Sequence, residues 1–522
     1  MTTSESQVTP DTPDTPDTDG PVVRTASGAV RGLREQGLSV FRGIPFAAPP
    51  VGEARFQAPR PPRPWDGTRE AYAFGPPPPQ ETGFVGRAVP LPAPQSDDWL
   101  TVNVWTPEPD PSAARPVMVW IYGGAYKLGF SGQPGYDAQH LARAGDVVVV
   151  TLNYRVGMEG FALWAGAPAN RGLLDQVAAL EWVQENIAAF GGDPGHVTVF
   201  GESAGAGSIA ALLAMPRARG LFRRAVTQSV PGTYFSADLA RDMASALAAE
   251  AGREPTAADL ASVAPQRLTE AGAALGAKMA QYTARWGQAA PTTVPFAPVV
   301  DGEILPDTPW QALAAGAARD IDLLVGHNRD EYRLFLVMAG LSGKVTDDLA
   351  TATLRMYAPG GESGEQAYRA AFPDATAEQL FARVQTDWLF ALPSLRLAEA
   401  QHAGGGRAHV YELTWPAPDT GGDLGACHAL DIPLLFGTYG ADLGALLFPG
   451  GRPTPEAERL TAFFQRAWPA FARTGDPGWP AYDPESRLVQ VLDAEPEVAP
   501  YPEERNRLIW EGYAFSALPL QG

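Results

Sequence analysis

The chain has 522 residues, 45% of them hydrophobic and 10% aromatic, which is enough apolar surface for a large folded core and excludes a mostly disordered protein. Acidic residues outnumber basic ones by 59 to 39, giving a net charge of −20, and no cluster of lysine and arginine predicts a nucleic-acid partner. The single cysteine, Cys427, excludes a disulfide within the chain.

The N-terminal segment, residues 1–20, is predicted to be a disordered acidic tail, because it repeats Thr-Pro-Asp and lacks apolar anchors. It has neither a basic start nor an apolar run, so no signal peptide is predicted. The chain contains no run of about 18 apolar residues, which predicts no membrane span and no membrane partner. We therefore expect a cytoplasmic protein.

Strands and helices are predicted to alternate over the first half of the folded chain, as in an α/β protein. Two runs, 117–122 and 146–153, are continuous and rich in β-branched residues, which is typical of strands buried on both faces of a sheet. Apolar residues at three- and four-residue spacing predict a helix over 172–190. Further strands are predicted at 29–31, 38–42 and 196–200, and a further helix from about Ser208.

The second half is predicted to add helices and more strands to the same sheet. Residues 236–290 are rich in alanine and helical in pattern, which we interpret as part of an insertion, about 236–320, over the edge of the sheet. No internal repeat and no long linker follow the tail, so residues 21–522 are predicted to form one large domain. Strands are predicted at 321–326, 408–413 and 488–492, the last of these being the final strand, and a helix at 455–474.

The sharpest motif is Gly201-Glu202-Ser203-Ala204-Gly205, which directly follows a predicted strand and precedes a helix. A Gly-x-Ser-x-Gly sequence in that context is typical of a nucleophile elbow. The small flanking residues allow a tight turn that exposes the serine hydroxyl above the sheet. Ser203 is therefore the candidate nucleophile.

A second motif overlaps the first, because residues 205–210 fit the dinucleotide-binding pattern Gly-x-Gly-x-x-Gly/Ala. That interpretation requires an acidic residue about 20 positions later, at the end of the next strand. The next predicted strand, 225–229, offers none. Close packing of a helix on a strand behind Ser203 is the better interpretation of these small residues.

A serine hydroxyl needs a general base, and the base needs an acidic residue that orients it. After a nucleophile elbow the expected order along the chain is serine, acid, histidine. His428 satisfies this order and lies in a loop after the strand at 408–413. His327 is a competitor, although it precedes the acidic pair Asp330-Glu331. The other histidines after Ser203 are His402, in a glycine-rich loop, and His409, inside a predicted strand.

These residues resemble the type B carboxylesterase family of α/β-hydrolases, which includes the cholinesterases. The resemblance runs from about Val22 to Asp493 and rests on several stretches in the family's order. They are Phe41-Arg-Gly-Ile-Pro-Phe-Ala-Ala-Pro-Pro-Val-Gly52, Val117-Met-Val-Trp-Ile-Tyr-Gly-Gly124, Asn153-Tyr-Arg-Val-Gly157, Gly172-Leu-Leu-Asp-Gln176, Trp182-Val-Gln-Glu-Asn-Ile187, Phe190-Gly-Gly-Asp-Pro194, Phe200-Gly-Glu-Ser-Ala-Gly205 and Pro298-Val-Val-Asp-Gly302.

The resemblance implies an α/β-hydrolase fold, with a central, mostly parallel sheet flanked by helices and a helical insertion over the active site. It implies a catalytic triad of Ser203 as nucleophile, Glu331 as acid and His428 as base. Asp330 is the neighbouring alternative to Glu331. No metal and no organic cofactor are implied.

The resemblance also implies an oxyanion hole, formed by backbone N–H groups of the loop Tyr122-Gly123-Gly124-Ala125 and of the residue after the nucleophile. The donors would be Gly124, Ala125 and Ala204. Glu202 and Ser229 match buried polar positions near the site, where a structural hydrogen-bonding role and a catalytic role both remain open.

The sequence departs from the family pattern at several positions, and some of these departures bear on the expected compartment and substrate. Ala125 stands where most members have glycine, and Tyr332 follows Glu331 where glycine is usual. Pro78 and Trp99 occupy the places of the two half-cystines of the family's N-terminal loop, which agrees with a reducing compartment. The loop over 80–95 has no tryptophan, the residue type that binds choline in cholinesterases, which argues against a choline substrate.

We therefore expect a serine carboxylic-ester hydrolase that acts through an acyl-enzyme on small to medium carboxylic esters. One alternative is the same machinery acting on amide, thioester or carbamate bonds, since specificity depends on pocket shape. Another is a catalytically silent binding protein of the same fold. The sequence leaves the oligomeric state open.

Overall fold

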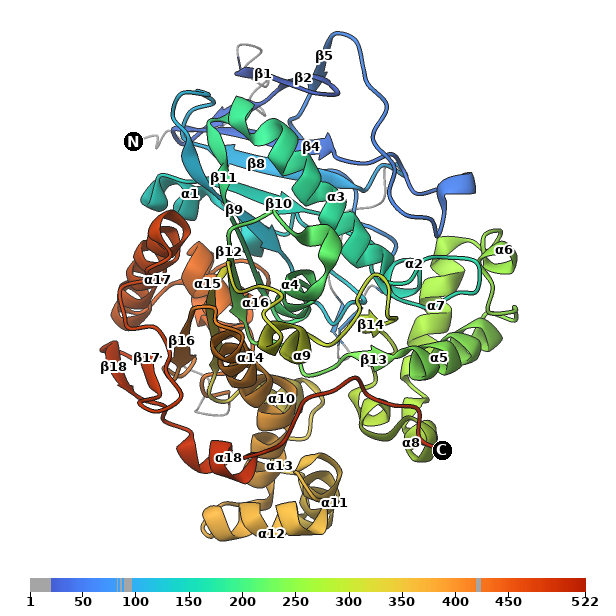
Figure 1. The fold of residues 1–522 in the computed structure, drawn as a ribbon, viewed down its shortest axis with the longest axis vertical. Helices are drawn as coiled ribbons and strands as arrows, with labels where there is room; N and C mark the ends of the chain where they lie inside the picture. The colour runs from blue at the N-terminus through green and yellow to red at the C-terminus, as the bar shows by residue number, and fades with distance from the viewer. Residues whose placement is uncertain (1–19, 82, 85–86, 89–95, 419–423) are drawn as a thin grey trace, which may run out of the picture.

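The computed structural model describes residues 20–81, 83–84, 87–88, 96–418 and 424–522, so the predicted disordered tail lies almost entirely outside the described residues. An eleven-stranded sheet runs through the centre of the molecule (Figure 1). Its strands are β3 (Leu33–Glu35), β4 (Leu38–Pro45), β8 (Thr101–Thr106), β9 (Arg115–Ile121), β10 (Val148–Leu152), β11 (Gly192–Glu202), β12 (Arg224–Gln228), β15 (Asp322–Asn328), β16 (Ala408–Leu413), β17 (Leu488–Leu492) and β18 (Glu497–Pro500).

The order of these strands across the sheet is β18-β17-β16-β15-β12-β11-β9-β10-β8-β4-β3. All pairs from β17 to β10 are parallel, and antiparallel strands extend both edges. The parallel strands are buried on both faces, which explains their continuous apolar sequences. The predicted α/β architecture with a mostly parallel sheet is therefore confirmed.

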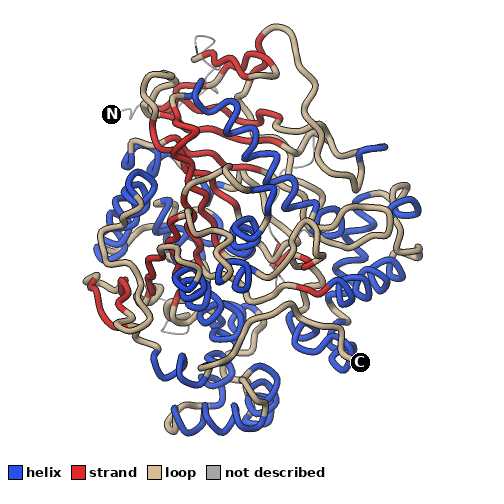
Figure 2. The backbone as a smooth tube through the Cα atoms, viewed as in Figure 1, coloured by secondary structure: helices blue, strands red, loops and turns tan. Residues whose placement is uncertain are grey.

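Helices cover both faces of the sheet (Figures 1 and 2). The predicted helix over 455–474 is observed as α17 (Pro455–Thr474), which begins at a Thr454 cap and ends at Gly475 in the left-handed region. It packs against β9, and α1 (Gln139–Gly145) lies beside it and packs against β8 and β10. The opposite face carries α3 (Arg171–Asn186), α4 (Ala204–Ala214) and α14 (Leu392–Ala403).

Two groups of helices lie outside these layers. The alanine-rich segment forms helices as predicted and lies on the right of Figure 1, where the backbone of Gln521 near the C-terminus bonds to α8. The second group, at the bottom of Figure 1, was not predicted. The first group is α5 (Ala237–Glu250), α6 (Ala257–Leu260), α7 (Pro265–Gly276) and α8 (Thr283–Trp286). The second is α10 (Tyr332–Met338), α11 (Asp347–Tyr357), α12 (Glu362–Ala371) and α13 (Ala377–Thr386).

Two predictions about individual elements are wrong, one about where a helix begins and one about which strand is the last. The helix expected from about Ser208 begins at Ala204, directly after the serine of the elbow, because that turn takes a single residue. The strand at 488–492 is not the last one, since β18 pairs antiparallel with it at the edge of the sheet.

The described residues include no helix both long and apolar enough to cross a lipid bilayer.

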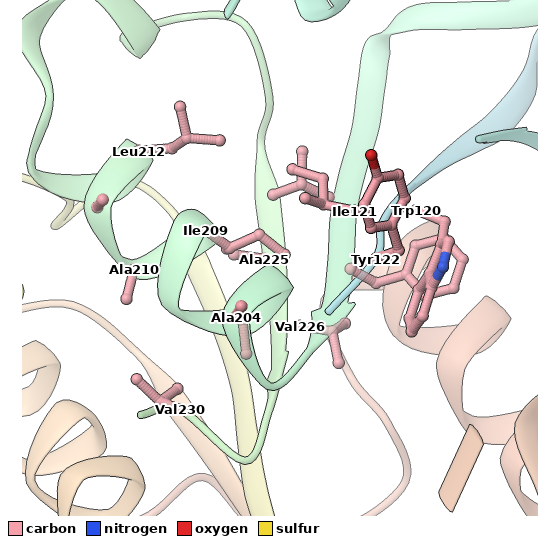
Figure 3. Packing of buried hydrophobic residues seen from close by; sticks show 14 of the residues in the cluster. Trp120, Ile121, Tyr122, Ala204, Ile209, Ala210, Leu212, Ala225, Val226 and Val230 are labelled. Carbon is pink, nitrogen blue, oxygen red and sulfur yellow. The ribbon is translucent and has the colours of Figure 1, made fainter. Parts of the chain in front are cut away.

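Helix α4 packs unusually close to strand β9 (Figure 3). A Cβ atom at Gly205 would lie 2.0 Å from the carbonyl oxygen of Ile121, and one at Gly201 would lie 2.5 Å from the same atom. Side chains of Ile121, Ile209 and Ala225 fill the space around this contact. Glycine is therefore required on both sides of Ser203 by packing, and the interpretation of residues 205–210 as a packing motif fits this geometry.

We expect Gly205→Ala to lower the melting temperature clearly, because its Cβ would overlap a backbone oxygen that cannot rotate away. Overpacking of this kind typically costs about 1–3 kcal/mol. Gly272→Ala in α7 is the control: its Cβ would find no heavy atom closer than 3.4 Å, so the variant should gain about 0.5–1 kcal/mol from the better helix former. Thermal unfolding of both variants checks this, and equal melting temperatures would contradict it.

Candidate active site

Ser203 is the single residue of a sharp turn between β11 and α4. Its backbone has φ 56° and ψ −126°, a conformation that a residue with a side chain rarely adopts. The residues on either side, Glu202 and Ala204, are buried, whereas Ser203 is only partly buried. The turn therefore presents the hydroxyl at the carboxyl end of the parallel strands, as predicted for a nucleophile elbow.

The loop after β9, residues 122–129, lies beside this turn; we call it the oxyanion loop. A Cβ at Gly123 would lie 3.0 Å from Cβ of Ser203, so the loop begins in direct contact with the elbow. Within the described residues, the N–H groups of Gly124 and Ala125 donate to no acceptor. Ala204 is the first residue of α4, whose N–H has no partner inside the helix. The three predicted donors are thus free to bind a ligand oxygen.

Glu331 and His428 meet at the carboxyl end of β15, although they are 97 residues apart. Nδ1 of His428 lies 2.6 Å from Oε2 of Glu331, which is itself completely buried. The other carboxylate oxygen accepts hydrogen bonds from the hydroxyl of Ser229 at 2.6 Å and the N–H of Asn328 at 2.8 Å. This carboxylate is therefore fully occupied, and it fixes both the position and the tautomer of the imidazole.

The other nitrogen of the imidazole faces the elbow. Nε2 of His428 lies 3.1 Å from Oε1 of Glu202, the residue immediately before Ser203. Burial on its own lowers the pKa of His428, but the carboxylates of Glu202 and Glu331 outweigh it and hold the pKa above its ordinary value. Burial raises the pKa of Glu202, against the attraction of His428. The charged forms of the imidazole and of the Glu202 carboxyl group therefore stabilise each other beside the elbow.

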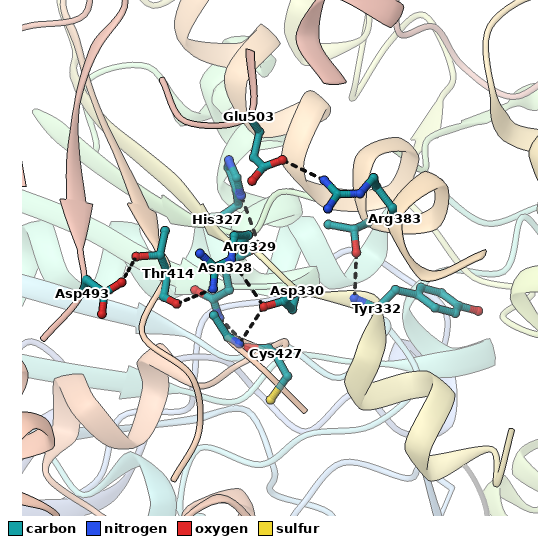
Figure 4. Close-up of polar contacts among 12 residues, drawn as sticks. His327, Asn328, Arg329, Asp330, Tyr332, Arg383, Thr414, Cys427, Asp493 and Glu503 are labelled. Atoms are coloured by element: carbon teal, nitrogen blue, oxygen red, sulfur yellow. Dashed lines mark hydrogen bonds and ion pairs between the residues drawn. The ribbon is translucent and has the colours of Figure 1, made fainter. Parts of the chain in front are cut away.

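The loop that carries His428 is held by three consecutive backbone contacts. Asp330 accepts from the N–H of Ala426 at 3.0 Å, and Asn328 donates its side-chain amide to the carbonyl of Cys427 at 2.8 Å (Figure 4). The N–H of His428 itself donates to the carbonyl of Glu331 at 3.2 Å. Asp330, the alternative acid, therefore contacts the loop and not the imidazole.

The other histidine candidates have different partners. Nε2 of His327 lies 3.1 Å from the hydroxyl of Tyr501, away from the elbow, and burial lowers its pKa. His409 lies within β16 and its ring contacts the carbonyl of Trp479 at 3.0 Å. The thiol of Cys427 is free and buried, and burial raises its pKa.

Sequence reasoning missed the aromatic cover of the imidazole. Phe390 stacks on His428 with ring centroids 4.3 Å apart, and Phe335 lies at 5.0 Å. Phe390 belongs to a π-helical turn, Asp387–Ala391, that joins α13 to α14. Neither residue carries a motif, and only the fold brings them to the site.

Among the residues whose placement is described, no group of three or more histidine, cysteine, aspartate or glutamate side chains is placed to hold a metal ion. The absence of any required cofactor stays a prediction.

The family model for carboxylesterases matches residues 19–507. The chain belongs to the carboxylesterase family. It is 38% identical over 497 residues to the para-nitrobenzyl esterase of Bacillus subtilis (strain 168), covering 93% of this chain and 97% of that protein. It is 35% identical over 488 residues to the phenmedipham hydrolase of Pseudarthrobacter oxydans, covering 91% of this chain and 95% of the relative.

Solved carboxylesterase structures have the same architecture. A carboxylesterase of Geobacillus stearothermophilus matches with a TM-score of 0.80 at 38% identity, covering 94% of this chain and 99% of that one. A para-nitrobenzyl esterase structure matches with a TM-score of 0.80 at 37% identity, with the same coverage of both chains. The predicted α/β-hydrolase fold and the assignment to carboxylesterase activity are therefore confirmed.

We expect Ala125→Gly to stabilise this carboxylesterase slightly and to change turnover less than about tenfold. Ala125 has φ 55°, and a left-handed conformation costs a residue with a Cβ roughly 1–2 kcal/mol. The larger backbone entropy of glycine in the unfolded chain offsets part of this, so the gain should be at most about 1 kcal/mol.

Ala114→Gly is the matched control for that variant, because Ala114 is an exposed alanine with φ 44° outside the site. It should give a similar gain in stability with unchanged turnover. Chemical denaturation and ester turnover are measured for both. A loss of stability in Ala125→Gly would show that the alanine side chain contributes packing that outweighs the strain.

Proposed function

We propose that the protein hydrolyses carboxylic esters through an acyl-enzyme on Ser203, with His428 as general base and Glu331 as the residue that orients it. The observation that carries the proposal is the 2.6 Å contact between Nδ1 of His428 and Glu331, with Nε2 of the same ring turned toward the elbow. A hydroxyl becomes an effective nucleophile when an adjacent base takes its proton.

In the first half of the reaction, Ser203 attacks the ester carbonyl while Nε2 of His428 accepts the hydroxyl proton. The carbonyl oxygen becomes negatively charged and binds to the N–H groups of Gly124, Ala125 and Ala204. His428 then donates its proton to the leaving alcohol as the C–O bond breaks. In the second half, water attacks the acyl-enzyme while His428 accepts a proton from it. His428 then returns this proton to the oxygen of Ser203 as the acyl–serine bond breaks and the carboxylic acid departs.

The two carboxylates near His428 have different places in this scheme. Glu331 is buried and fully hydrogen-bonded, so it stays beside the ring and stabilises the imidazolium that forms in each half-reaction. Glu202 approaches the reacting nitrogen itself, so its negative charge favours the protonated ring. Ser229 supports Glu331 through its hydroxyl and takes no part in proton transfer in this scheme.

The substrates proposed are small to medium carboxylic esters. Relatives carry names that refer to para-nitrobenzyl esters, phenmedipham and fumonisin B1, so the family accommodates substrates of different shape. Amide, thioester and carbamate bonds are the alternative for the same machinery. Nitrophenyl esters of increasing acyl length, run beside benzyl esters, carbamates and anilides, discriminate among these classes.

A cytoplasmic location and the absence of nucleic-acid and membrane partners belong to the same proposal. The net charge of −20 disfavours binding to phosphate backbones. The one cysteine is buried and unpaired, which is compatible with a reducing compartment. A binding protein without catalysis is the weaker alternative, because it would not require the contact of His428 with Glu331 beside the turn that carries Ser203.

Ser203→Ala should lower ester turnover by about four to six orders of magnitude without changing the melting temperature, because the three groups act as a unit. A fluorophosphonate should label Ser203, as mass spectrometry of the peptide can show. Ser208→Ala is the matched control, since this buried hydroxyl lies one turn along α4 and contacts Gln176 at 3.1 Å. Retained turnover in Ser203→Ala would contradict the assignment.

The pH dependence tests the charges around His428. The base acts when it is neutral, so kcat/KM should fall toward acid pH, and the raised pKa places this decrease above pH 6.5. Glu202→Gln removes one of the two negative charges, so the midpoint should move to lower pH by roughly one unit. A pH–rate profile with an activated ester measures both. An unchanged midpoint in Glu202→Gln would show that Glu202 is already neutral in the free enzyme.

A further inference from the structure

The oxyanion loop has an unusual backbone. Four of its eight residues have positive φ: Gly124 at 109°, Ala125 at 55°, Tyr126 at 57° and Gly129 at 135°. Two of the four carry side chains, for which this conformation is strained, and strain of this kind persists only where the surroundings hold it. The contacts that hold this loop are therefore part of what places its N–H groups.

The far end of the loop folds back on its beginning. A Cβ at Gly129 would lie 2.2 Å from the ring of Tyr122 and 3.0 Å from the carbonyl oxygen of Gly123. A Cβ at Gly124 would lie 2.3 Å from the carbonyl oxygen of Leu128. Gly129 is thus packed against Gly123, and its neighbour Leu128 against Gly124, so a displacement at this end of the loop is transmitted toward the elbow.

One side chain from outside the loop binds both backbone groups of Gly129. The N–H of Gly129 donates to Oε1 of Gln80 at 2.8 Å, and Nε2 of Gln80 donates to the carbonyl of Gly129 at 2.8 Å. Gln80 is 8% exposed and its amide also donates to the carbonyl of Pro78 at 3.1 Å. A primary amide has a carbonyl oxygen and an NH₂ group side by side, so it can satisfy a backbone donor and a backbone acceptor at once.

The segment that carries Gln80 is stiff and is attached on both sides. It follows four consecutive prolines, Pro76–Pro79, whose φ angles are fixed by their rings. Nδ2 of Asn153 donates to the carbonyl of Pro76 at 3.1 Å. On the other side, Oε2 of Glu81 lies 3.1 Å from Nζ of Lys127, itself a residue of the oxyanion loop.

We infer that Gln80 is a positioning residue for the oxyanion hole: it fixes Gly129, and through Gly129 the N–H groups of Gly124 and Ala125. The inference rests on the proposed function of those N–H groups. Gln80 itself contacts neither substrate nor the reacting atoms in this scheme. Its loss should weaken binding of the oxyanion in the transition state and leave ground-state binding of the ester almost unchanged.

The test replaces Gln80 by methionine, which keeps the length of the side chain and removes both hydrogen bonds with Gly129 as well as the one to Pro78. A misplacement of catalytic groups by about 1 Å can cost about a hundredfold in rate, so kcat should fall about ten- to a hundredfold with KM within about threefold. The inhibition constant of an aryl trifluoromethyl ketone, which forms an oxyanion on the serine, should rise by a similar factor. Gln80→Glu keeps only the acceptor for the N–H of Gly129, so its kcat should lie between those of the wild type and Gln80→Met.

Gln401→Met is the matched control for a general loss of stability. Gln401 lies on α14, away from the oxyanion loop, and is 1% exposed. Its side-chain amide donates to the carbonyls of Ala318 and Ile321. It should lower the melting temperature about as much as Gln80→Met while leaving kcat within about twofold. If the two variants lose kcat in proportion to their melting temperatures, Gln80 is merely structural and the inference is overturned.

Hydrogen exchange of the peptide over residues 122–129 gives a readout that needs no turnover. Exchange should be faster in Gln80→Met than in the wild type and unchanged in Gln401→Met. If exchange is faster in Gln80→Met but the wild-type protein cleaves no ester, Gln80 does position the loop and the proposed function is rejected. Unchanged exchange together with kcat within about twofold of the wild type would reject the positioning role in an active esterase.

Discussion

The contact between the start of helix α4 and the end of strand β9 is the constraint on which the site depends. No atom larger than hydrogen fits at position 201 or 205, since both face the carbonyl oxygen of Ile121. The chain must therefore pass from strand to helix in one residue, and Ser203 takes a conformation that costs of order 1–3 kcal/mol. The buried sheet around it supplies that energy through packing, so the strain is held by the core and not by local sequence.

The remaining parts of the site are placed by the same sheet. In the register of β9 and β11, Gly201 pairs with Ile121, so the elbow and the oxyanion loop leave adjacent strands at the same level. Glu331 follows β15, two strands away from β11, and its neighbours Asn328 and Asp330 fix the loop that carries His428. Distant parts of the chain thus converge because parallel strands end at one edge, where a functional site is expected in open α/β sheets.

The sequence allowed the strong elements of the fold to be predicted and left the contact-dependent ones unpredicted. The strand predicted at 117–122 from a continuous apolar run and the helix predicted at 455–474 are observed as β9 and α17, with boundaries within two residues. The start of α4 was placed too late, because its first turn consists of small residues that carry no helical pattern. Periodicity cannot decide between Asp330 and Glu331 either, whereas in the structure one carboxylate contacts Ala426 and the other contacts His428. Phe390 and Gln80 were missed for a related reason, since each acts through a partner that is distant in sequence.

The segment before the oxyanion loop shows how this chain manages without the disulfide that the family resemblance implies near Pro78. A disulfide would restrict the unfolded chain mainly through loop closure. Four prolines instead restrict residues 76–79 by fixing φ, which also lowers the entropy of the unfolded state. Prolines have no backbone N–H to donate, however, so the attachment of the segment to the rest of the protein depends on side chains that contact it. The attachment comes from Gln80, Glu81 and Asn153, and two of these three side chains bind the loop whose N–H groups face the elbow. Rigidity and attachment are thus supplied by different residues. The position of the oxyanion loop therefore depends on single polar side chains, whereas a covalent cross-link would not depend on them.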